Sequence, residues 1–336
     1  MKTFVVERYG KSGLLAAEMP NPTIAPDEIL VRVCAASINP LDMMLRNGEF
    51  KQLLKYKTPF VLGHDLAGVV VDMGSEVRGY KIGDEIFARP RDLHIGAFAE
   101  YIAINPKDIA LKPKSLTMEQ AAAVPLVALA AWQALVDLAQ VKPGQKILIH
   151  AGAGGLGSTA IQVAKHLGAY VATTANAKDT ERLRTLGADE IIDYTTTNFA
   201  DALSGYDAVL DSLGGENLAR SMTILKPGGL AISVVGPPDA MFASQIGQPL
   251  LRPVMALLSW KIRARARKLG VRYSFFFMQA NGAQLQALAA LYDAGVLRPV
   301  LDRVFPFSET LDAVAYVEQG RAKGKVVVAM PSSSAN

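Results

Sequence analysis

A glycine-rich loop is the clearest chemical feature of this sequence. Gly152-Ala153-Gly154-Gly155-Leu156-Gly157 has the spacing G-x-G-x-x-G and lies between an apolar run that ends at His150 and a segment with helical periodicity. A dinucleotide-binding loop requires this context. The glycines allow a tight turn and let a pyrophosphate approach backbone N–H groups at the positive end of the helix. A glycine-rich turn without a ligand is the alternative, and the flanking strand and helix disfavour it. The loop therefore predicts a bound dinucleotide.

The end of the next predicted strand distinguishes NADPH from NADH. An NAD site places Asp or Glu about 20 residues after the loop, where the carboxylate accepts hydrogen bonds from the ribose 2′-hydroxyl. This strand ends without a carboxylate, in a stretch that contains Thr174, Asn176 and Lys178. A lysine with hydroxyl and amide groups could hold a 2′-phosphate, and Asp179 is expected to cap the following helix. The sequence favours NADPH.

Alternating strands and helices surround this loop. Short apolar runs suited to buried parallel strands occur at 146–150, 170–174, 190–193, 208–211 and 230–235, with a sixth near 271–276. Helices are expected at 158–167, 179–186 and 216–225. The alternation predicts a doubly wound parallel sheet with right-handed crossovers. Ligands of such sheets bind beyond the carboxyl ends of the strands, so Leu213, Val235 and Gly236 are expected to border the nicotinamide.

The rest of the chain has a different pattern. Residues 1 to about 115 are rich in short strands between Pro, Gly and Asp turns. The tail from residue 284 adds helices and strands near 303–305 and 325–328, which are expected to complete this β domain. A chain of 336 residues exceeds what one hydrophobic core usually serves. We predict an α/β protein with a β-rich domain of residues 1–125 and 279–336 and a nucleotide-binding domain of residues 126–278.

Composition excludes several classes of protein. A hydrophobic content of 50% and a charged content of 20% fit a globular protein, and the single cysteine, Cys34, excludes a disulfide framework. We find no signal-peptide pattern and no apolar stretch of the roughly 18 residues that a membrane span needs, so a cytoplasmic location is expected. The net charge of +4 comes from one segment, because residues 261–272 contain six Lys or Arg residues and no acid. Nucleic-acid binding is not expected.

Several passages of the sequence resemble the medium-chain dehydrogenase/reductase superfamily, and within it the zinc-independent NADPH:quinone oxidoreductase (zeta-crystallin-like) branch. They are residues 36–42, 63–70, 152–157 and 320–328, with further matches at 125–135 and 186–194. The resemblance covers nearly the whole chain. It implies a GroES-like amino-terminal domain, a Rossmann domain that binds NADPH, an active-site cleft between the two domains, and a homodimer.

The resemblance also bears on metal binding. In zinc-dependent relatives the first ligand is a Cys where this chain has Asn39, and the third lies near Leu126, so only His64 remains at a ligand position. A catalytic zinc needs three protein ligands. We therefore predict no zinc and expect His64 to be a hydrogen-bonded, partly buried histidine. Hydride transfer without a Lewis acid disfavours alcohol oxidation and favours quinones, enones and enals.

The resemblance suggests few residues with a direct role in catalysis. Asn39, before Pro40, is the candidate for positioning the nicotinamide ribose, and a simple Asn-Pro turn is the alternative. Tyr194 lies where relatives have a tyrosine near the adenosine phosphate, with a packed core tyrosine as the alternative. Lys323 and Lys325 are further candidates for cofactor contact, with solvated lysines as the alternative. No general acid stands out, and water could protonate the product.

We therefore expect an NADPH-dependent reductase of quinones or α,β-unsaturated carbonyls, acting on a small molecule. Two alternatives remain open. One is a stand-alone enoyl-thioester reductase with the same fold and cofactor. The other is a non-catalytic NADPH-binding protein that acts as a sensor or a structural component.

The segment 239–278 is longer than in compact relatives. Its apolar residues recur every three or four positions beside the six positive charges: Met255, Leu258, Ile262, Ala266 and Leu269. One interpretation is a membrane-surface helix. The other, which the sequence favours, is a helix that covers the cleft or a dimer interface, without membrane contact.

Overall fold

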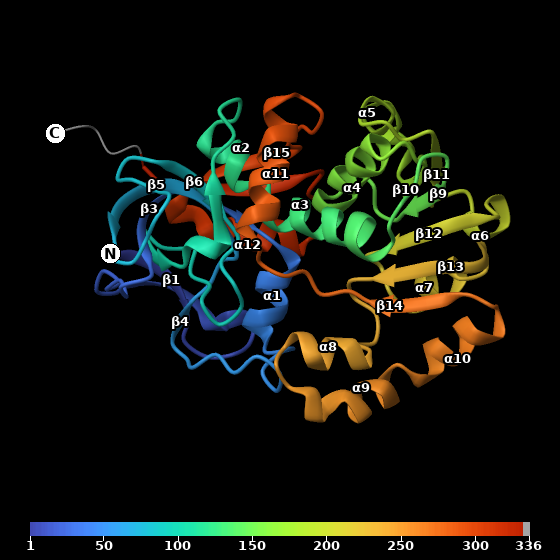
Figure 1. Ribbon diagram of the computed structural model, residues 1–336, viewed down its shortest axis with the longest axis horizontal. Coiled ribbons are helices and arrows are strands. Elements are labelled where there is room, and N and C mark those ends of the chain that lie inside the picture. Colours follow the sequence, from blue (N-terminus) through green and yellow to red (C-terminus); the bar gives the residue numbers. More distant parts are fainter. Residues whose placement is uncertain (332–336) are drawn as a thin grey trace. The chain divides into compact units, whose positions relative to one another are not determined.

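The computed structural model describes residues 1–331 of the chain. The chain divides into two units, one comprising Met1–Leu129 with the part from Gln279 onward, the other comprising Ala130–Met278 (Figure 1). The first boundary falls inside helix α3 (Pro125–Trp132).

The second unit contains a six-stranded sheet in the order β11-β10-β9-β12-β13-β14, with all neighbours parallel. The strands are β9 (Lys146–Ile149), β10 (Tyr170–Ala175), β11 (Glu190–Asp193), β12 (Tyr206–Asp211), β13 (Leu225–Ser233) and β14 (Arg272–Phe275). The chain leaves β9 in one direction along the sheet and returns to β12 on its other side, which is the topology of a Rossmann fold. The predicted doubly wound parallel sheet is confirmed.

Helices connect these strands. They are α4 (Gly155–His166), α5 (Thr180–Thr185), α6 (Phe199–Ala202) and α7 (Gly215–Ser221), while α8 (Ala240–Gln245), α9 (Arg252–Leu258) and α10 (Trp260–Lys268) precede β14. Figure 1 shows these last three beyond β14, along the edge of the sheet. Buried side chains of β9, β12 and β13 pack against α7 and α10 in one apolar cluster. That cluster holds the sheet and the helices together as one body.

The first unit contains a seven-stranded sheet in the order β15-β16-β3-β5-β6-β8, with β7 paired to β3. These strands are β3 (Ile29–Ile38), β5 (Asp65–Met73), β6 (Glu85–Ala88), β7 (Tyr101–Ile104), β8 (Ile109–Leu111), β15 (Leu301–Pro306) and β16 (Lys325–Ala329). A smaller sheet joins β1 (Lys2–Val6), β2 (Leu14–Glu18) and β4 (Phe60–Val61). The helices are α1 (Pro40–Asn47), α2 (Met118–Ala122), α11 (Gly282–Asp293) and α12 (Thr310–Glu318).

The tail completes the first unit, as the sequence predicted. β16 pairs antiparallel with β3, and β15 pairs parallel with β16. Alternate residues of these strands, such as Val31 and Val33 of β3 and Val326 and Val328 of β16, share one buried apolar core. Because strands from both ends of the chain supply this core, neither segment could form it alone.

A buried histidine connects the end of β9 to its neighbours. His150 Nδ1 lies 3.0 Å from Thr174 Oγ1, and Nε2 lies 2.8 Å from Ser221 Oγ. Ser221 Oγ already donates to the Asn217 carbonyl at 2.7 Å, so Nε2 donates to Ser221 and Nδ1 accepts from Thr174. Burial lowers the pKa of His150 to about 4, against an opposing effect of Asp211. The neutral imidazole therefore connects β9, β10 and α7.

This histidine predicts a specific pH dependence of stability. Between pH 6.5 and pH 4 the unfolded chain binds a proton at His150 that the folded protein excludes, so the free energy of unfolding decreases as the pH falls through this range. We expect the loss from this residue at pH 4.5 to be on the order of 2 kcal/mol. Denaturant unfolding of wild type and His150→Gln at pH 7 and pH 4.5 measures it, because the variant lacks this contribution. The exposed His166, changed to Gln, is the control and should retain the wild-type pH dependence. If the free energy of unfolding fell by the same amount between pH 7 and pH 4.5 in wild type and in His150→Gln, the prediction would be contradicted.

Candidate functional site

The glycine-rich loop follows β9 and leads into α4, and two of its glycines have no room for a side chain. A Cβ on Gly152 would lie 2.2 Å from Thr173 Oγ1, and one on Gly157 would lie 2.3 Å from the Ala151 carbonyl oxygen. A Cβ on Gly154 would meet nothing closer than 3.4 Å. The outer glycines thus allow the close contact of loop, strand and helix, while the middle one leaves the backbone open to a ligand.

The start of α4 supplies the hydrogen-bond donors of this loop. The helix begins at Gly155 with Gly154 at its N-cap position, and the first N–H groups of any helix lack intrahelical acceptors. Ala151, just before the loop, has a φ of +52°, a left-handed conformation that is costly for a residue with a Cβ. The loop is held in this geometry by Thr174, whose Oγ1 accepts from the Ala151 N–H at 3.2 Å. A cradle of N–H groups with no side chain in it fits a pyrophosphate.

The turn after β10 contains the residues predicted to contact the adenosine 2′-phosphate. Lys178 is exposed, and its backbone N–H donates to Asn176 Oδ1 at 3.1 Å. Thr174 is buried and bonded to His150 and to Ala151. The hydroxyl of Thr174 therefore orients the glycine-rich loop, while Asn176 shapes the turn that presents the lysine.

Arg182, a residue that the sequence pattern did not bring forward, connects this turn to the glycine-rich loop. Its Nη2 donates to the Ala153 carbonyl oxygen and to Asp179 Oδ1, both at 3.2 Å. Asp179 stands at the N-cap position of α5, but its side chain makes no capping hydrogen bond there, contrary to the expectation. The spacing of three residues between Asp179 and Arg182 was the available signal, because an acid at a helix start can pair with a cation three residues later. A second cation thus lies beside the predicted phosphate position.

Tyr194 follows β11 and lies next to the end of β10. Its backbone N–H donates to the Ala175 carbonyl oxygen at 3.3 Å. The side chain is 64% exposed, so the alternative of a packed core tyrosine is wrong. The exposed ring stands at the same edge of the sheet as Lys178.

The loops after β12 and β13 are tied together by a buried carboxylate. Asp211 accepts the N–H groups of Leu213 and Gly214, at 3.1 Å each, and the hydroxyl of Ser233 at 2.6 Å. Ser233 Oγ in turn accepts the Gly236 N–H at 2.9 Å. The apolar side chains of Leu213 and Val235 remain exposed on these loops. The sequence indicated the loops, but it did not indicate the pair of residues that fixes them.

All of the predicted cofactor residues of the second unit therefore lie at the carboxyl edge of its sheet, after β9, β10, β11, β12 and β13. Asn39 and Lys323 belong to the first unit. Lys323 is exposed near the end of the chain. Their contact with a cofactor stays a prediction.

Asn39 lies in a buried polar cluster of the first unit. It is 1% exposed, and its Nδ2 donates to Asp65 Oδ2 at 2.9 Å. Lys325 Nζ donates to Asn39 Oδ1 and forms an ion pair with Asp65 at 3.2 Å. Asp65 also accepts the Leu126 N–H at 2.8 Å. Lys325, which the sequence left between cofactor contact and solvation, is thus buried against Asp65.

His64 belongs to the same region. Its Nδ1 lies 2.6 Å from Asp42 Oδ1, and the other oxygen of Asp42 accepts the Asn39 N–H at 2.7 Å. The histidine is hydrogen-bonded as expected, but it is fully buried rather than partly buried. It directly precedes strand β5 and contacts helix α1 through Asp42, a pairing that the sequence pattern alone could not show.

These residues do not fit a catalytic zinc. Among residues 1–331, no three His, Cys, Asp or Glu side chains form a group that could hold a metal ion. Asn39 stands at the first ligand position and Leu126 lies near the third, and one ring nitrogen of His64 is engaged by Asp42. The Lys325 ammonium, in contact with Asn39 and Asp65, would repel a divalent cation.

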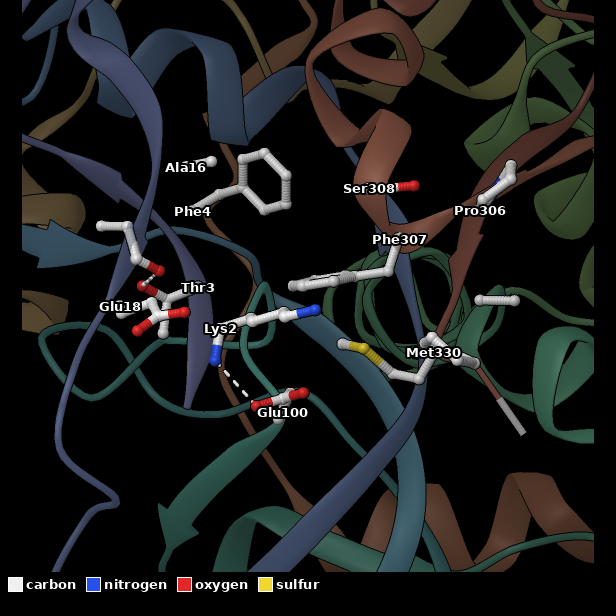
Figure 2. A pocket seen from close by; sticks show the side chains of 13 residues that line it. Lys2, Thr3, Phe4, Ala16, Glu18, Glu100, Pro306, Phe307, Ser308 and Met330 are labelled. Carbon is white, nitrogen blue, oxygen red and sulfur yellow. Dashed lines mark hydrogen bonds between the residues drawn. The ribbon is translucent and has the colours of Figure 1, made fainter. Parts of the chain in front are cut away.

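The first unit also has a cavity of about 750 Å³ (Figure 2). Lys2, Phe4, Glu18, Glu100, Phe307 and Met330 are among the residues that line it. The Lys2 N–H donates to Glu100 Oε2 at 2.7 Å across one side of it. None of the predicted cofactor or catalytic residues lines this cavity, so we assign it no part in the predicted chemistry.

Comparison with known proteins supports the resemblance seen in the sequence. Residues 25–115 match the family model described as alcohol dehydrogenase GroES-like domain, and residues 186–328 match the one described as zinc-binding dehydrogenase. The zinc of that description is a property of the family, and the side chains around His64 do not fit it.

Individual relatives match over nearly the whole chain. The chain is 35% identical to the mitochondrial NAD(P)H oxidoreductase RTN4IP1 of Mus musculus, over 98% of this chain and 89% of the relative. It is 36% identical to the chloroplastic NADPH-dependent alkenal/one oxidoreductase of Arabidopsis thaliana, over 98% and 79%. The solved structure of the quinone oxidoreductase from Coxiella burnetii superimposes with a TM-score of 0.86 at 32% identity, over 98% and 99%.

The Rossmann sheet, the glycine-rich loop and these matches lead to one conclusion. The predicted fold class, a GroES-like domain with a Rossmann domain, is confirmed. The chain belongs to the medium-chain dehydrogenase/reductase superfamily.

Proposed function

We propose that the protein is an NADPH-dependent oxidoreductase that reduces quinones or α,β-unsaturated carbonyls without a metal ion. The glycine-rich loop provides the main support, because its outer glycines have no space for a Cβ and its middle glycine is open. The names of the relatives, an NADPH-dependent alkenal/one oxidoreductase and a quinone oxidoreductase, support the class of acceptor.

In this proposal the second unit holds the cofactor along the carboxyl edge of its sheet. The N–H groups in the first turn of α4 bind the pyrophosphate, because those of Gly152 and Gly154 already donate to the Thr174 and Ala151 carbonyls. Lys178 and Arg182 bind the 2′-phosphate. Tyr194 lies beside the adenosine, and Leu213, Val235 and Gly236 border the nicotinamide. When bound, NADPH supplies the hydride. The protein positions the reactants and excludes water with apolar side chains.

We also propose a positioning role for Asn39. Its amide is fixed from both sides, because Lys325 donates to its oxygen and its nitrogen donates to Asp65. A side chain held this firmly cannot adapt to a wrong substrate pose.

A homodimer in the cytoplasm is part of the same proposal, although the named relatives from mouse and Arabidopsis are mitochondrial and chloroplastic.

An acceptor screen tests the proposed activity. We expect the purified protein to oxidise NADPH with 1,4-benzoquinone, 9,10-phenanthrenequinone or a long-chain enal, and to keep this activity after treatment with EDTA. Faster turnover with a crotonyl thioester would instead favour an enoyl-thioester reductase. Tight NADPH binding without turnover of any acceptor would leave the non-catalytic alternative, and loss of activity in EDTA would contradict the absence of metal.

The cofactor preference depends on the turn after β10. We expect Lys178→Glu to weaken NADPH binding by roughly ten-fold or more, because a charge-assisted hydrogen bond to phosphate is lost and a repulsion is added. NADH binding should change far less. Fluorescence titration with both cofactors gives the two dissociation constants. Arg184→Glu, an exposed change of equal charge in helix α5, is the control and should spare NADPH binding. Equal losses for NADPH and NADH would refute the assignment.

The role of Asn39 can be separated from that of its cluster. We expect Asn39→Ala to lower kcat by roughly ten-fold or more, since small misplacements of a positioned group reduce turnover strongly, while the dissociation constant of NADPH stays the same. Ser37, whose hydroxyl donates to Asp65 at 2.9 Å, contacts the same carboxylate without an amide. Steady-state kinetics of Asn39→Ala and Ser37→Ala distinguish the two cases. Similar losses in both variants would mean that Asn39 acts only through the stability of the cluster.

A further inference from the structure

The helices before β14 have an apolar surface exposed to solvent. Leu250 is 91% exposed, Leu257 is 68% exposed and Trp260 is 53% exposed. Val254 and Leu258 are exposed beside them. Large apolar side chains that lie close together on a surface usually mark an interaction site.

Leu250, Val254 and Leu257 lie along one face of a nearly continuous helix. Leu258 and Trp260 flank this face on its two sides. The Ser259 N–H donates to the Met255 carbonyl, and the Arg263 N–H donates to the Ser259 carbonyl, so the i to i−4 pattern crosses the junction of α9 and α10. Residues spaced by three and four then share the outward face: Leu250, Val254, Leu257, Lys261, Ala264 and Lys268. This outward face begins apolar and ends basic.

The inward face explains where the predicted apolar stripe was wrong. Met255 and Ala266 are buried, and Ile262 is half-buried against the core of the second unit, but Leu258 and Leu269 are exposed. Only Met255, Ile262 and Ala266 of the predicted stripe therefore pack toward the second unit. The exposed remainder is available for a partner.

The charge of the second half of this face is of one sign. Lys261 and Lys268 are exposed on this face, Arg263 and Arg267 are exposed elsewhere on the same helix, and residues 261–272 contain no acid. Arg265 is exposed as well, and its Nε donates to the Ala219 carbonyl of α7 at 3.1 Å. The surface therefore requires an acidic partner.

We propose that the outward face of residues 250–268 docks on an anionic phospholipid bilayer. An apolar face flanked by Lys and Arg is the pattern of helices that lie in the membrane interface, where the apolar side chains enter the acyl boundary and the cations meet headgroup phosphates. Within the part of the chain that the structure describes, no helix is both long and apolar enough to cross a membrane. The sequence pattern favoured a helix that covers the cleft or a dimer interface. The exposure of Leu250, Leu257 and Trp260 leads us to prefer the membrane-surface helix instead.

Vesicle flotation with the full-length protein tests the proposal. Vesicles of equimolar phosphatidylcholine and phosphatidylglycerol should bind the protein at low salt, vesicles of phosphatidylcholine alone should bind much less, and high salt should release it. Emission from Trp260, one of two tryptophans in the chain, should shift to shorter wavelength on binding. Trp260→Phe should abolish that shift.

Matched variants show whether this face is responsible. Lys261→Gln with Lys268→Gln should weaken partitioning roughly thirty-fold, because each basic residue near an anionic surface contributes about 1 kcal/mol. Leu257→Ser with Trp260→Ser should also reduce binding. Lys51→Gln with Lys55→Gln removes the same charge from exposed positions of the first unit and should leave binding unchanged.

Several outcomes would overturn the proposal. They are absence of vesicle binding, equal binding to neutral and anionic vesicles, or equal losses in the two lysine double variants. The remaining alternative is that this face pairs with a second copy of the chain. Light scattering of the lipid-free protein measures the oligomeric state and tests it. If Leu257→Ser with Trp260→Ser dissociates a dimer and the wild type does not bind vesicles, the face is a homodimer interface. NADPH oxidation by the same variants is measured in parallel, so a failure of the proposed activity is recognised separately.

Discussion

The close contact of the glycine-rich loop with β10 and with its own helix is the constraint on which the site depends. Thr173 Oγ1 lies where a Cβ of residue 152 would be, and the Ala151 carbonyl lies where a Cβ of residue 157 would be. Only glycine satisfies both positions. Because the loop can then turn tightly between β9 and α4, the helix points its free N–H groups to the carboxyl edge of the sheet. Every other predicted cofactor residue of this unit is arranged around that point.

Two buried polar networks keep that edge rigid. His150 connects β9 to Thr174 on β10 and to Ser221 on α7, while Asp211 connects the loops after β12 and β13 through Ser233. Both networks lie at the ends of strands, where the ladder hydrogen bonds stop. Fully satisfied buried polar groups fix one geometry, whereas an apolar replacement would permit several. The loops that face the ligand therefore need not be ordered by the ligand.

The sequence predicted the fold and the positions of the loops better than the contacts within them. Periodicity and glycine spacing are local signals, and they indicated β9 to β14 and the loop at residues 152–157. The pairing of Lys325 with Asn39 and Asp65 joins positions about 260 to 290 residues apart, as their contacts show. No local pattern contains that information. Arg182 was missed for a different reason, because its acceptor on the glycine-rich loop is a backbone carbonyl, which any residue type could supply.

The carboxylate of Asp65 explains how the first unit replaces a metal-centred cluster. It accepts from the Ser37 hydroxyl, the Asn39 amide and the Leu126 N–H, and it pairs with the Lys325 ammonium. A buried carboxylate is costly unless its charge is compensated and its oxygens are hydrogen-bonded, and here both conditions are met by the chain itself. Since β16 delivers Lys325 from the carboxyl end of the chain, the cluster forms only when the tail has paired with β3. The positioning of Asn39 is thereby a consequence of completing the fold, and no metal ion is needed for it.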